Sequence, residues 1–153
     1  MSEIALRPAH ADDAEFLFAL MKVSLGPYVI ETFGPWDDSA QRTRFFASLV
    51  LERHQIVEHN GECIGCLSVA REPELLRLNR VFLLPSHQGR GIGSRLVADL
   101  IREADAAKLP IRLRVLRVNP ARRLYERLGF RVFDRSETHF LMERSAALSQ
   151  TPR

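Results

Sequence analysis

The chain lacks the features by which several classes of protein are recognised. No run of about 18 apolar residues occurs, so we expect no membrane-spanning segment. The first residues, MSEIALRPAH, show no basic start followed by an apolar core, which predicts a cytoplasmic protein without a secretory signal. No block of about five like charges occurs, so the net charge of +3 gives no indication of nucleic-acid binding. The composition that is present, 46% hydrophobic and 27% charged residues, is typical of a globular domain.

Cysteine is scarce, with two residues at positions 63 and 66 in the sequence CIGC. They follow the turn sequence NGE within an apolar run that predicts a strand, and strand residues three apart point to opposite faces. A zinc site needs a second pair of ligands, and the sequence has no second cysteine pair. We therefore expect two reduced packing cysteines and no metal site.

Repeats and low-complexity segments are also absent, and the hydrophobic pattern divides the chain into short elements. Alternation predicts strands at 3–9, 55–59, 63–70, 74–84, 111–118, 131–135 and 138–143, and helical spacing predicts helices at 12–24, 45–50, 92–104 and 120–128. The order β-α-α-β-β-β-α-β-α-β-β predicts an α/β domain of the α+β type, with four helices on a mixed, largely antiparallel sheet of about six to seven strands. We expect one domain over 1–145 and a loose tail over 146–153.

Glycines occupy every second position at 89, 91 and 93, between a predicted strand and a predicted helix. Such a loop directs backbone N–H groups at an anion, and the helix start adds partial positive charge. The Gly-Lys-Ser/Thr of a P-loop is missing, and the dinucleotide pattern G-x-G-x-x-G fails at Ser94. The pattern Q-x-x-G-x-G is met by Gln88, Gly91 and Gly93. A tight turn without a ligand is the alternative.

With these residues the sequence resembles the GCN5-related N-acetyltransferase (GNAT) superfamily, whose members hold the pyrophosphate of acetyl-coenzyme A on such a loop. Three segments carry the resemblance in the family's order: LRPAHADDAEFLFAL, RVFLLPSHQGRGIGSRLV and NPARRLYERLGFRVF. Together they extend over most of the chain. The resemblance implies the single-domain GNAT fold and acetyl-CoA as cosubstrate.

The resemblance also implies which residues hold the cofactor. Val81, Phe82 and Leu83 would pair with the pantetheine arm as a further strand would. Backbone amides after Gln88 would wrap the pyrophosphate, and they belong to Gly89, Arg90, Gly91, Ile92, Gly93 and Ser94. The Arg90 side chain either adds charge near the phosphates or is solvated. Asn119 either bonds the pantetheine or caps the helix that follows it.

For the chemistry, Tyr125 matches the tyrosine with which the family protonates the departing thiolate. Its ordinary pKa of about 10 keeps such a hydroxyl protonated at neutral pH. Because Tyr125 shares a helical face with apolar residues, a packing role is the alternative. The family's glutamate base has no counterpart here. The segment GPYVIETFGPW, which breaks the first helical pattern, supplies Glu31 as the candidate base, whereas Asp37 and Asp38 fit helix capping equally well and His139 fits a packed or surface position.

We therefore expect an acetyl-CoA-dependent N-acetyltransferase that transfers the acetyl group directly to a primary amine of a small molecule, peptide or protein in a ternary complex. Neither cysteine lies where a covalent relay would be expected. The alternative is a catalytically inactive acyl-CoA-binding sensor or interaction module, which the missing base favours and Tyr125 opposes. The motifs do not specify the acceptor, although the acidic residues of 31–38 favour a cationic small molecule. The length of the acyl chain and the oligomeric state, a homodimer included, stay open.

Overall fold

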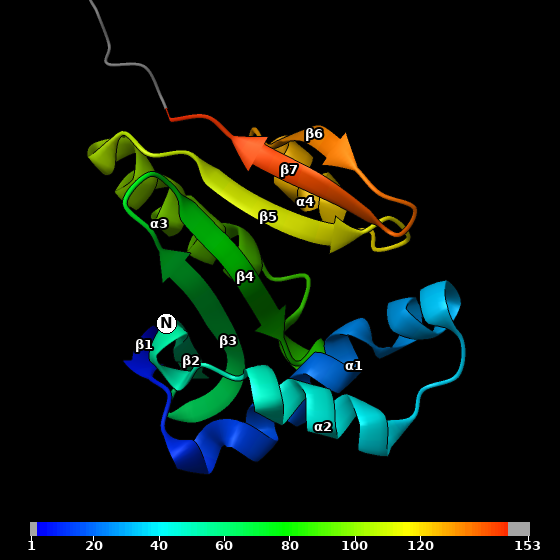
Figure 1. Ribbon diagram of the computed structural model, residues 1–153. Helices are drawn as coiled ribbons and strands as arrows, with labels where there is room; N and C mark the ends of the chain where they lie inside the picture. The colour runs from blue at the N-terminus through cyan, green and yellow to red at the C-terminus, as the bar shows by residue number, and fades with distance from the viewer. Residues whose placement is uncertain (1–2, 147–153) are drawn as a thin grey trace, which may run out of the picture. The chain divides into compact units, whose positions relative to one another are not determined.

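The computed structural model describes residues 3–146, where seven strands and four α-helices are joined by turns and short 3-10 segments (Figure 1). In chain order the elements are β1 (Ile4–Pro8), α1 (Ala14–Phe33), α2 (Asp38–Ser48), β2 (His54–His59), β3 (Glu62–Arg71), β4 (Leu76–Leu83), α3 (Ile92–Ala107), β5 (Ile111–Leu116), α4 (Ala121–Arg127), β6 (Arg131–Arg135) and β7 (His139–Arg144). This order confirms the predicted one. The tail predicted over 146–153 lies, apart from residue 146, outside the described residues.

The strands form a mixed sheet in the order β1-β2-β3-β4-β5-β7-β6. Antiparallel pairs join β1 to β2, β2 to β3, β5 to β7 and β6 to β7. β4 and β5 run parallel, with Leu76 opposite Ile111 and Arg77 opposite Arg112. They run parallel because α3 connects them as a crossover. The predicted mixed, largely antiparallel sheet is confirmed.

Within the described range the chain divides into two compact units. Unit 1 comprises residues 3–68 and 80–93, and unit 2 comprises residues 69–79 and 94–146. The core of unit 1 gathers buried side chains from α1, α2, β2 and β3, which are Leu17, Phe18, Leu20, Met21, Phe45, Ile56 and Cys66. The rings of Phe18 and Phe45 meet edge to face with centroids 5.5 Å apart. Unit 1 therefore has an apolar core of its own.

The first helix is longer than its sequence pattern predicts. The pattern predicts a break at Gly26-Pro27, but α1 continues through both residues to Phe33. It ends where Gly34 adopts a φ of 100°. The predicted break is wrong because Gly26, which lacks a Cβ, relieves the clash that a proline ring makes with the preceding residue. The helix therefore loses one hydrogen bond at Pro27 without ending there.

The stretch Ala11–Phe33 is the one helical segment within residues 3–146 that is long and apolar enough to cross a membrane. Charged residues interrupt it, so it contains no unbroken apolar run of that length. Length and composition alone are weak evidence for a membrane span, because a core helix of a globular protein can be equally long and apolar. Leu17, Phe18, Leu20 and Met21 of this stretch lie in the core of unit 1, which agrees with a core helix.

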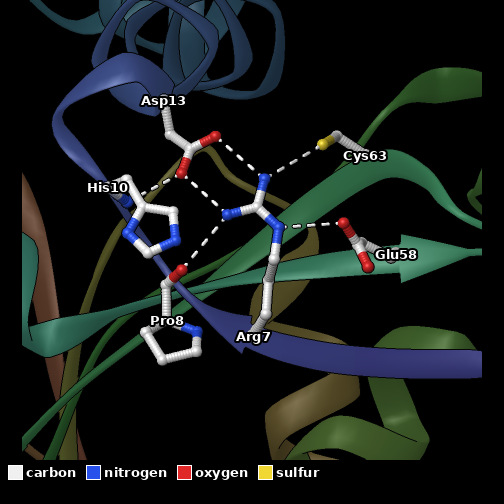
Figure 2. A network of polar contacts seen from close by, with 6 residues as sticks. All are labelled: Arg7, Pro8, His10, Asp13, Glu58 and Cys63. Atoms are coloured by element: carbon white, nitrogen blue, oxygen red, sulfur yellow. Dashed lines mark hydrogen bonds and ion pairs between the residues drawn. The ribbon is translucent and has the colours of Figure 1, made fainter.

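An arginine near the start of the chain ties together several elements of unit 1 (Figure 2). The Arg7 guanidinium donates two hydrogen bonds to the Asp13 carboxylate, at 2.9 and 3.0 Å, and one to Glu58 at 2.9 Å. It also lies 3.5 Å from Sγ of Cys63. Asp13 in turn accepts a hydrogen bond from the His10 N–H at 2.7 Å. The network thereby fastens β1 and the turn before α1 to β2 and β3.

The β2–β3 hairpin closes through Asn60-Gly61, as the sequence predicts. Asn60 and Gly61 both have positive φ, 51° and 86°, as a type I′ turn requires. His59 therefore pairs with Glu62 across the turn.

Unit 2 contains β5, β6, β7 and α4. Its largest fully buried side chains are those of Phe130, Ile111 and Met142. Gly129 follows α4 with a φ of 98°, and its N–H donates to the Glu126 carbonyl at 3.1 Å. A glycine just past the helix end lets the chain turn from α4 into β6.

Candidate functional site

The glycine-rich loop joins β4 to α3. Gly89 and Gly91 have φ values of 76° and 79°, whereas Arg90 between them has a negative φ. This alternation turns successive N–H groups toward a common point, which is the geometry of an anion-binding nest. A Cβ at Gly89 or Gly91 would meet nothing within 4 Å. Backbone conformation, and not crowding inside the protein, therefore requires glycine at these two positions.

The third glycine of the loop behaves differently. Gly93 does not have a positive φ, and a Cβ there would meet only Leu83 Cδ1, at an ordinary 3.9 Å. Neither strain nor packing within unit 1 requires glycine at this position. Gly93 lies in the first turn of α3, where backbone N–H groups have no partner within the helix. A contact between these N–H groups and the cofactor stays a prediction.

Two side-chain contacts hold the loop to the rest of unit 1. Gln88 Nε2 donates a hydrogen bond to the carbonyl oxygen of Leu83 at 2.9 Å. In the 3-10 turn Pro85–His87, the Nε2 of His87 lies 3.1 Å from Nδ1 of His59 on β2. Gln88, predicted as part of the cofactor motif, therefore has its amide nitrogen engaged with the end of β4.

Strand β3 approaches the end of β4 closely at Gly65. A Cβ on Gly65 would lie 2.2 Å from the carbonyl oxygen of Phe82 and 2.7 Å from Leu83 Cδ2. The N–H of Leu84 donates to the Ile64 carbonyl at 2.7 Å, which joins the two strands at this point. The backbone at Phe82 and Leu83 is thus held firmly from the β3 side. Sequence reasoning missed Gly65 because its close contacts are with Phe82 and Leu83, which are distant in the sequence.

Tyr125 lies on α4 in unit 2, with 9% of its surface exposed. Its ring packs edge to face against Phe130, with centroids 5.7 Å apart. Burial raises the pKa of Tyr125 to about 12, so the hydroxyl keeps its proton at neutral pH. Within residues 3–146 this hydroxyl has no hydrogen-bond partner. The ring is part of the core, and a role of the hydroxyl in proton transfer stays a prediction.

Asn119 caps the start of α4 with its side chain. Its Oδ1 accepts a hydrogen bond from the N–H of Ala121 at 2.9 Å. The helix begins at Ala121 with Pro120 as its cap residue, which corrects the predicted start by one position. A contact between Asn119 and the cofactor stays a prediction.

Of the three acidic residues from Glu31 to Asp38, two have structural partners. Asp37 caps α2, as predicted. Asp38 accepts hydrogen bonds from Lys22 at 2.8 Å and from the Trp36 indole at 2.9 Å. Glu31, the candidate base, is exposed on α1 and forms no ion pair within residues 3–146. Asp37 and Asp38 are therefore already engaged within unit 1.

Arg80, which directly precedes Val81 on β4, is half-buried against other parts of unit 1. Its Nη1 lies 2.9 Å from Nε2 of His54, and its guanidinium carbon lies 4.9 Å from the ring centroid of Phe45. His54 is buried, and its Nδ1 lies 2.8 Å from the carbonyl oxygen of Val50. Because a carbonyl can only accept, Nδ1 carries the proton and Nε2 accepts from Arg80. Burial lowers the pKa of His54, so the ring is neutral at neutral pH.

A comparison with protein families identifies this arrangement. The family model of the acetyltransferase (GNAT) domain matches residues 50–132, more than half of the chain. The chain belongs to the GNAT acetyltransferase family. The match includes the glycine loop, Asn119 and Tyr125, and it confirms the resemblance inferred from the sequence. No curated protein sequence matches this GNAT protein.

Solved structures share the fold of this GNAT protein. PaiA N-acetyltransferase from Thermoplasma acidophilum, solved in complex with coenzyme A, is 19% identical, with a TM-score of 0.75 over 94% of this chain and 99% of that chain. The ribosomal-protein-S18-alanine N-acetyltransferase from Escherichia coli is 17% identical, with a TM-score of 0.68 over 99% of each chain. An acetyltransferase from Thermus thermophilus is 22% identical, with a TM-score of 0.68 over 93% and 96% of the two chains. The predicted GNAT fold is confirmed.

The predicted site residues of this GNAT protein are distributed over both units. Unit 1 holds Glu31 and the stretch from Val81 to Gly93, and unit 2 holds Ser94, Asn119 and Tyr125. Within residues 3–146, no group of three or more His, Cys, Asp or Glu side chains is arranged to hold a metal ion. Sequence reasoning did not single out Arg80. Its contacts with His54 and Phe45 join segments far apart in the chain, which no local pattern reveals.

Proposed function

We propose that this GNAT protein is an acetyl-CoA-dependent N-acetyltransferase that moves the acetyl group from the thioester directly to a primary amine in a ternary complex. The observation that carries the proposal is the acetyltransferase domain match across a loop whose Gly89 and Gly91 adopt φ values of 76° and 79°. The coenzyme A bound to PaiA N-acetyltransferase supports the cosubstrate. The S18-alanine N-acetyltransferase supports an amine as acceptor.

In this proposal the pyrophosphate lies on the N–H groups of Gly89 to Ser94. The nest at Gly89–Gly91 and the positive end of the 16-residue α3 both favour an anion. The helix dipole contributes about 0.3–1 kcal/mol, and each hydrogen bond to a charged oxygen contributes about 1.5–3 kcal/mol. The hydrogen bonds therefore supply most of the binding energy of this part of the cofactor.

The pantetheine arm, in the same proposal, pairs with the backbone of Val81, Phe82 and Leu83. These residues lie beyond Leu76 and Arg77, the two β4 residues that pair with β5. Gly65 supports this backbone from the β3 side. One of the amides in this segment polarises the thioester carbonyl and stabilises the oxyanion that develops when the amine attacks.

Tyr125 is the proposed general acid. The amine nitrogen attacks the carbonyl carbon, the carbon–sulfur bond breaks, and the departing thiolate takes the phenolic proton. Because burial raises the pKa of Tyr125 to about 12, it is a weak acid that donates only as negative charge develops on sulfur. Glu31, an exposed carboxylate of unit 1, is the proposed base for the proton that the amine loses.

Direct transfer without a covalent intermediate agrees with the state of the two cysteines. Burial raises the pKa of Cys66 to about 12, so it carries no thiolate at neutral pH. Cys63 lies 3.5 Å from the Arg7 guanidinium, which is itself bound to Asp13 and Glu58. Neither sulfur is presented as a nucleophile.

Release of free coenzyme A in the presence of a panel of primary amines tests the proposal. The variants are Tyr125→Phe and, as matched control, Tyr28→Phe, because the chain has two tyrosines. We expect Tyr125→Phe to lower kcat by a factor of about 10²–10⁴, the contribution of a positioned general acid, with little change in the KM for acetyl-CoA. Tyr28→Phe should match the wild type. An undiminished kcat in Tyr125→Phe would show that another group supplies the proton.

The rival function is an acyl-CoA-binding sensor module, which the absence of the family's strand glutamate favours. Both functions predict that acetyl-CoA raises the thermal stability of the protein. Stabilisation by acetyl-CoA without release of coenzyme A to any amine would favour the sensor. Stabilisation together with amine-dependent release would exclude it.

A further inference from the structure

Arg80 is a half-buried cation. It lacks the carboxylate partner that a half-buried arginine usually has. Within residues 3–146, no Asp or Glu forms an ion pair or hydrogen bond with its guanidinium. By contrast, Arg144, with 20% of its side chain exposed, pairs with Asp105 at 2.8 Å. Arg7, with 31% exposed, pairs with two carboxylates. A partly desolvated guanidinium without a counter-charge is costly in free energy. Binding an anion would lower that cost, so Arg80 is a candidate anion-binding group.

The groups around Arg80 are neutral. His54 is uncharged at neutral pH because burial lowers its pKa. Cys66 stays protonated because burial raises its pKa to about 12. Phe45 offers the face of an aromatic ring at 4.9 Å. The positive charge of Arg80 is therefore not compensated by its surroundings in unit 1.

The same groups fix the orientation of the guanidinium. The Val50 carbonyl fixes the His54 tautomer, and the His54 Nε2 then accepts one N–H of Arg80 at 2.9 Å. Phe45 covers one face of the guanidinium. Arginine has five N–H donors in a planar fork, so several remain after the bond to His54. A fork held in this way matches the two oxygens of a carboxylate.

We propose that Arg80 binds the carboxylate of the acceptor, so that the substrates of this enzyme are amines that also carry a carboxylate, such as amino acids. The inference rests on the proposed N-acetyltransferase function. It replaces the sequence-based expectation of a cationic acceptor, because Asp37 and Asp38 are engaged by α2, Lys22 and Trp36.

The position of Arg80 along β4 favours the acceptor over the phosphates of the cofactor. The phosphate-binding loop begins at Gly89, and the pantetheine arm runs from there past Leu83 toward Val81 in the proposed complex. The thioester is at the far end of that arm from the pyrophosphate. In the proposed complex Arg80 therefore lies next to the thioester end of the arm. The acceptor amine must reach the thioester at that end.

The kinetic test compares acceptor pairs that differ only in the carboxylate, each an amino acid and its carboxamide. For the wild type we expect kcat/KM to be about tenfold or more higher for the carboxylate member, the ratio that one charge-assisted interaction supplies. Arg80→Gln should remove this preference by raising the acceptor KM about tenfold, with the KM for acetyl-CoA unchanged. Arg80→Lys should retain part of the preference. Arg77→Gln is the matched control, an exposed arginine on the same strand that pairs with Glu72 at 3.0 Å.

A binding experiment separates this inference from the proposed function. The 15N–1H signals of arginine Nε–H groups are followed while N-acetylglycine or N-acetylglycinamide is added to the wild type, and Arg80→Lys assigns the Arg80 signal by its loss. A shift of that signal with the carboxylate and none with the amide would support the carboxylate site even if no amine were acetylated. No shift with either probe would overturn it.

Three kinetic outcomes would also overturn the inference. The first is a wild type that acetylates carboxamides as well as amino acids, and the second is a preference for carboxylates that persists in Arg80→Gln. The third is an increase in the KM for acetyl-CoA in Arg80→Gln, which would assign Arg80 to a phosphate of the cofactor. If Arg80→Gln does not fold, as judged by circular dichroism, the same comparisons apply to Arg80→Met, which also removes the charge.

Discussion

Replacing Gly65 with alanine tests how closely β3 must approach β4 for this protein to fold and bind its cofactor. The new Cβ would lie 2.2 Å from the Phe82 carbonyl oxygen, about 1.2 Å inside the 3.4 Å at which ordinary contact begins. That oxygen belongs to the backbone, so no side-chain rotation relieves the clash. Overpacking of a well-packed interior costs about 1–3 kcal/mol, and we expect the upper end, about 3 kcal/mol, because a strand must move.

Urea unfolding of Gly65→Ala, followed by circular dichroism, measures this cost. Gly61→Ala is the matched control in the same hairpin, because its Cβ would meet nothing within 4 Å and only the strain of its φ of 86° remains. That strain costs about 1 kcal/mol. Since Phe82 belongs to the proposed pantetheine segment, Gly65→Ala should also weaken acetyl-CoA binding about tenfold or more, and Gly61→Ala should not. Equal stability of the two variants with unchanged acetyl-CoA binding would refute the reasoning.

Two further predictions concern the pH dependence of stability. Burial lowers the pKa of His54, so below about pH 6.5 the unfolded chain takes up this proton before the folded chain, and stability is lost as the pH falls. His54→Gln should show a smaller loss between about pH 7.5 and about pH 5.5 in urea unfolding, and an unchanged slope would contradict the assignment. The Arg7 guanidinium holds the pKa of Asp13 below its ordinary value, so this ion pair stabilises the fold above about pH 4 and is lost as the pH falls further. Asp13→Asn should cost about 1.5–3 kcal/mol at neutral pH and less at about pH 2, and a loss of the same size at both pH values would argue against the ion pair.

Much of the fold follows from local patterns in the sequence. Asn60-Gly61 is a strong hairpin signal, and both residues adopt the positive φ that the turn requires. The continuation of α1 through Gly26-Pro27 could not be predicted in the same way. A proline within an otherwise helical pattern usually ends or kinks the helix, whereas here burial of Leu17, Leu20 and Met21 on the same helix favours a continuous element.

The part of the candidate site that could be predicted from the sequence is the glycine loop, whose expected role depends on backbone conformation. The spacing of Gly89 and Gly91 indicates a phosphate loop because positive φ is a property of the individual residue. Arg80 and Gly65 were not predictable, because their roles depend on what lies opposite them in space. The neutral surroundings of Arg80 include Phe45 and His54, which are many residues away in the chain.

We propose that this GNAT protein binds acetyl-CoA on its glycine loop and transfers the acetyl group to an amine. The most direct measurement is thermal unfolding of the wild type with and without acetyl-CoA, combined with amine-dependent release of coenzyme A from the same samples. We predict stabilisation of about 2.7 kcal/mol when acetyl-CoA is present at about one hundred times its Kd, together with release that requires an amine. An unchanged unfolding temperature and no release with any amine would contradict the claim.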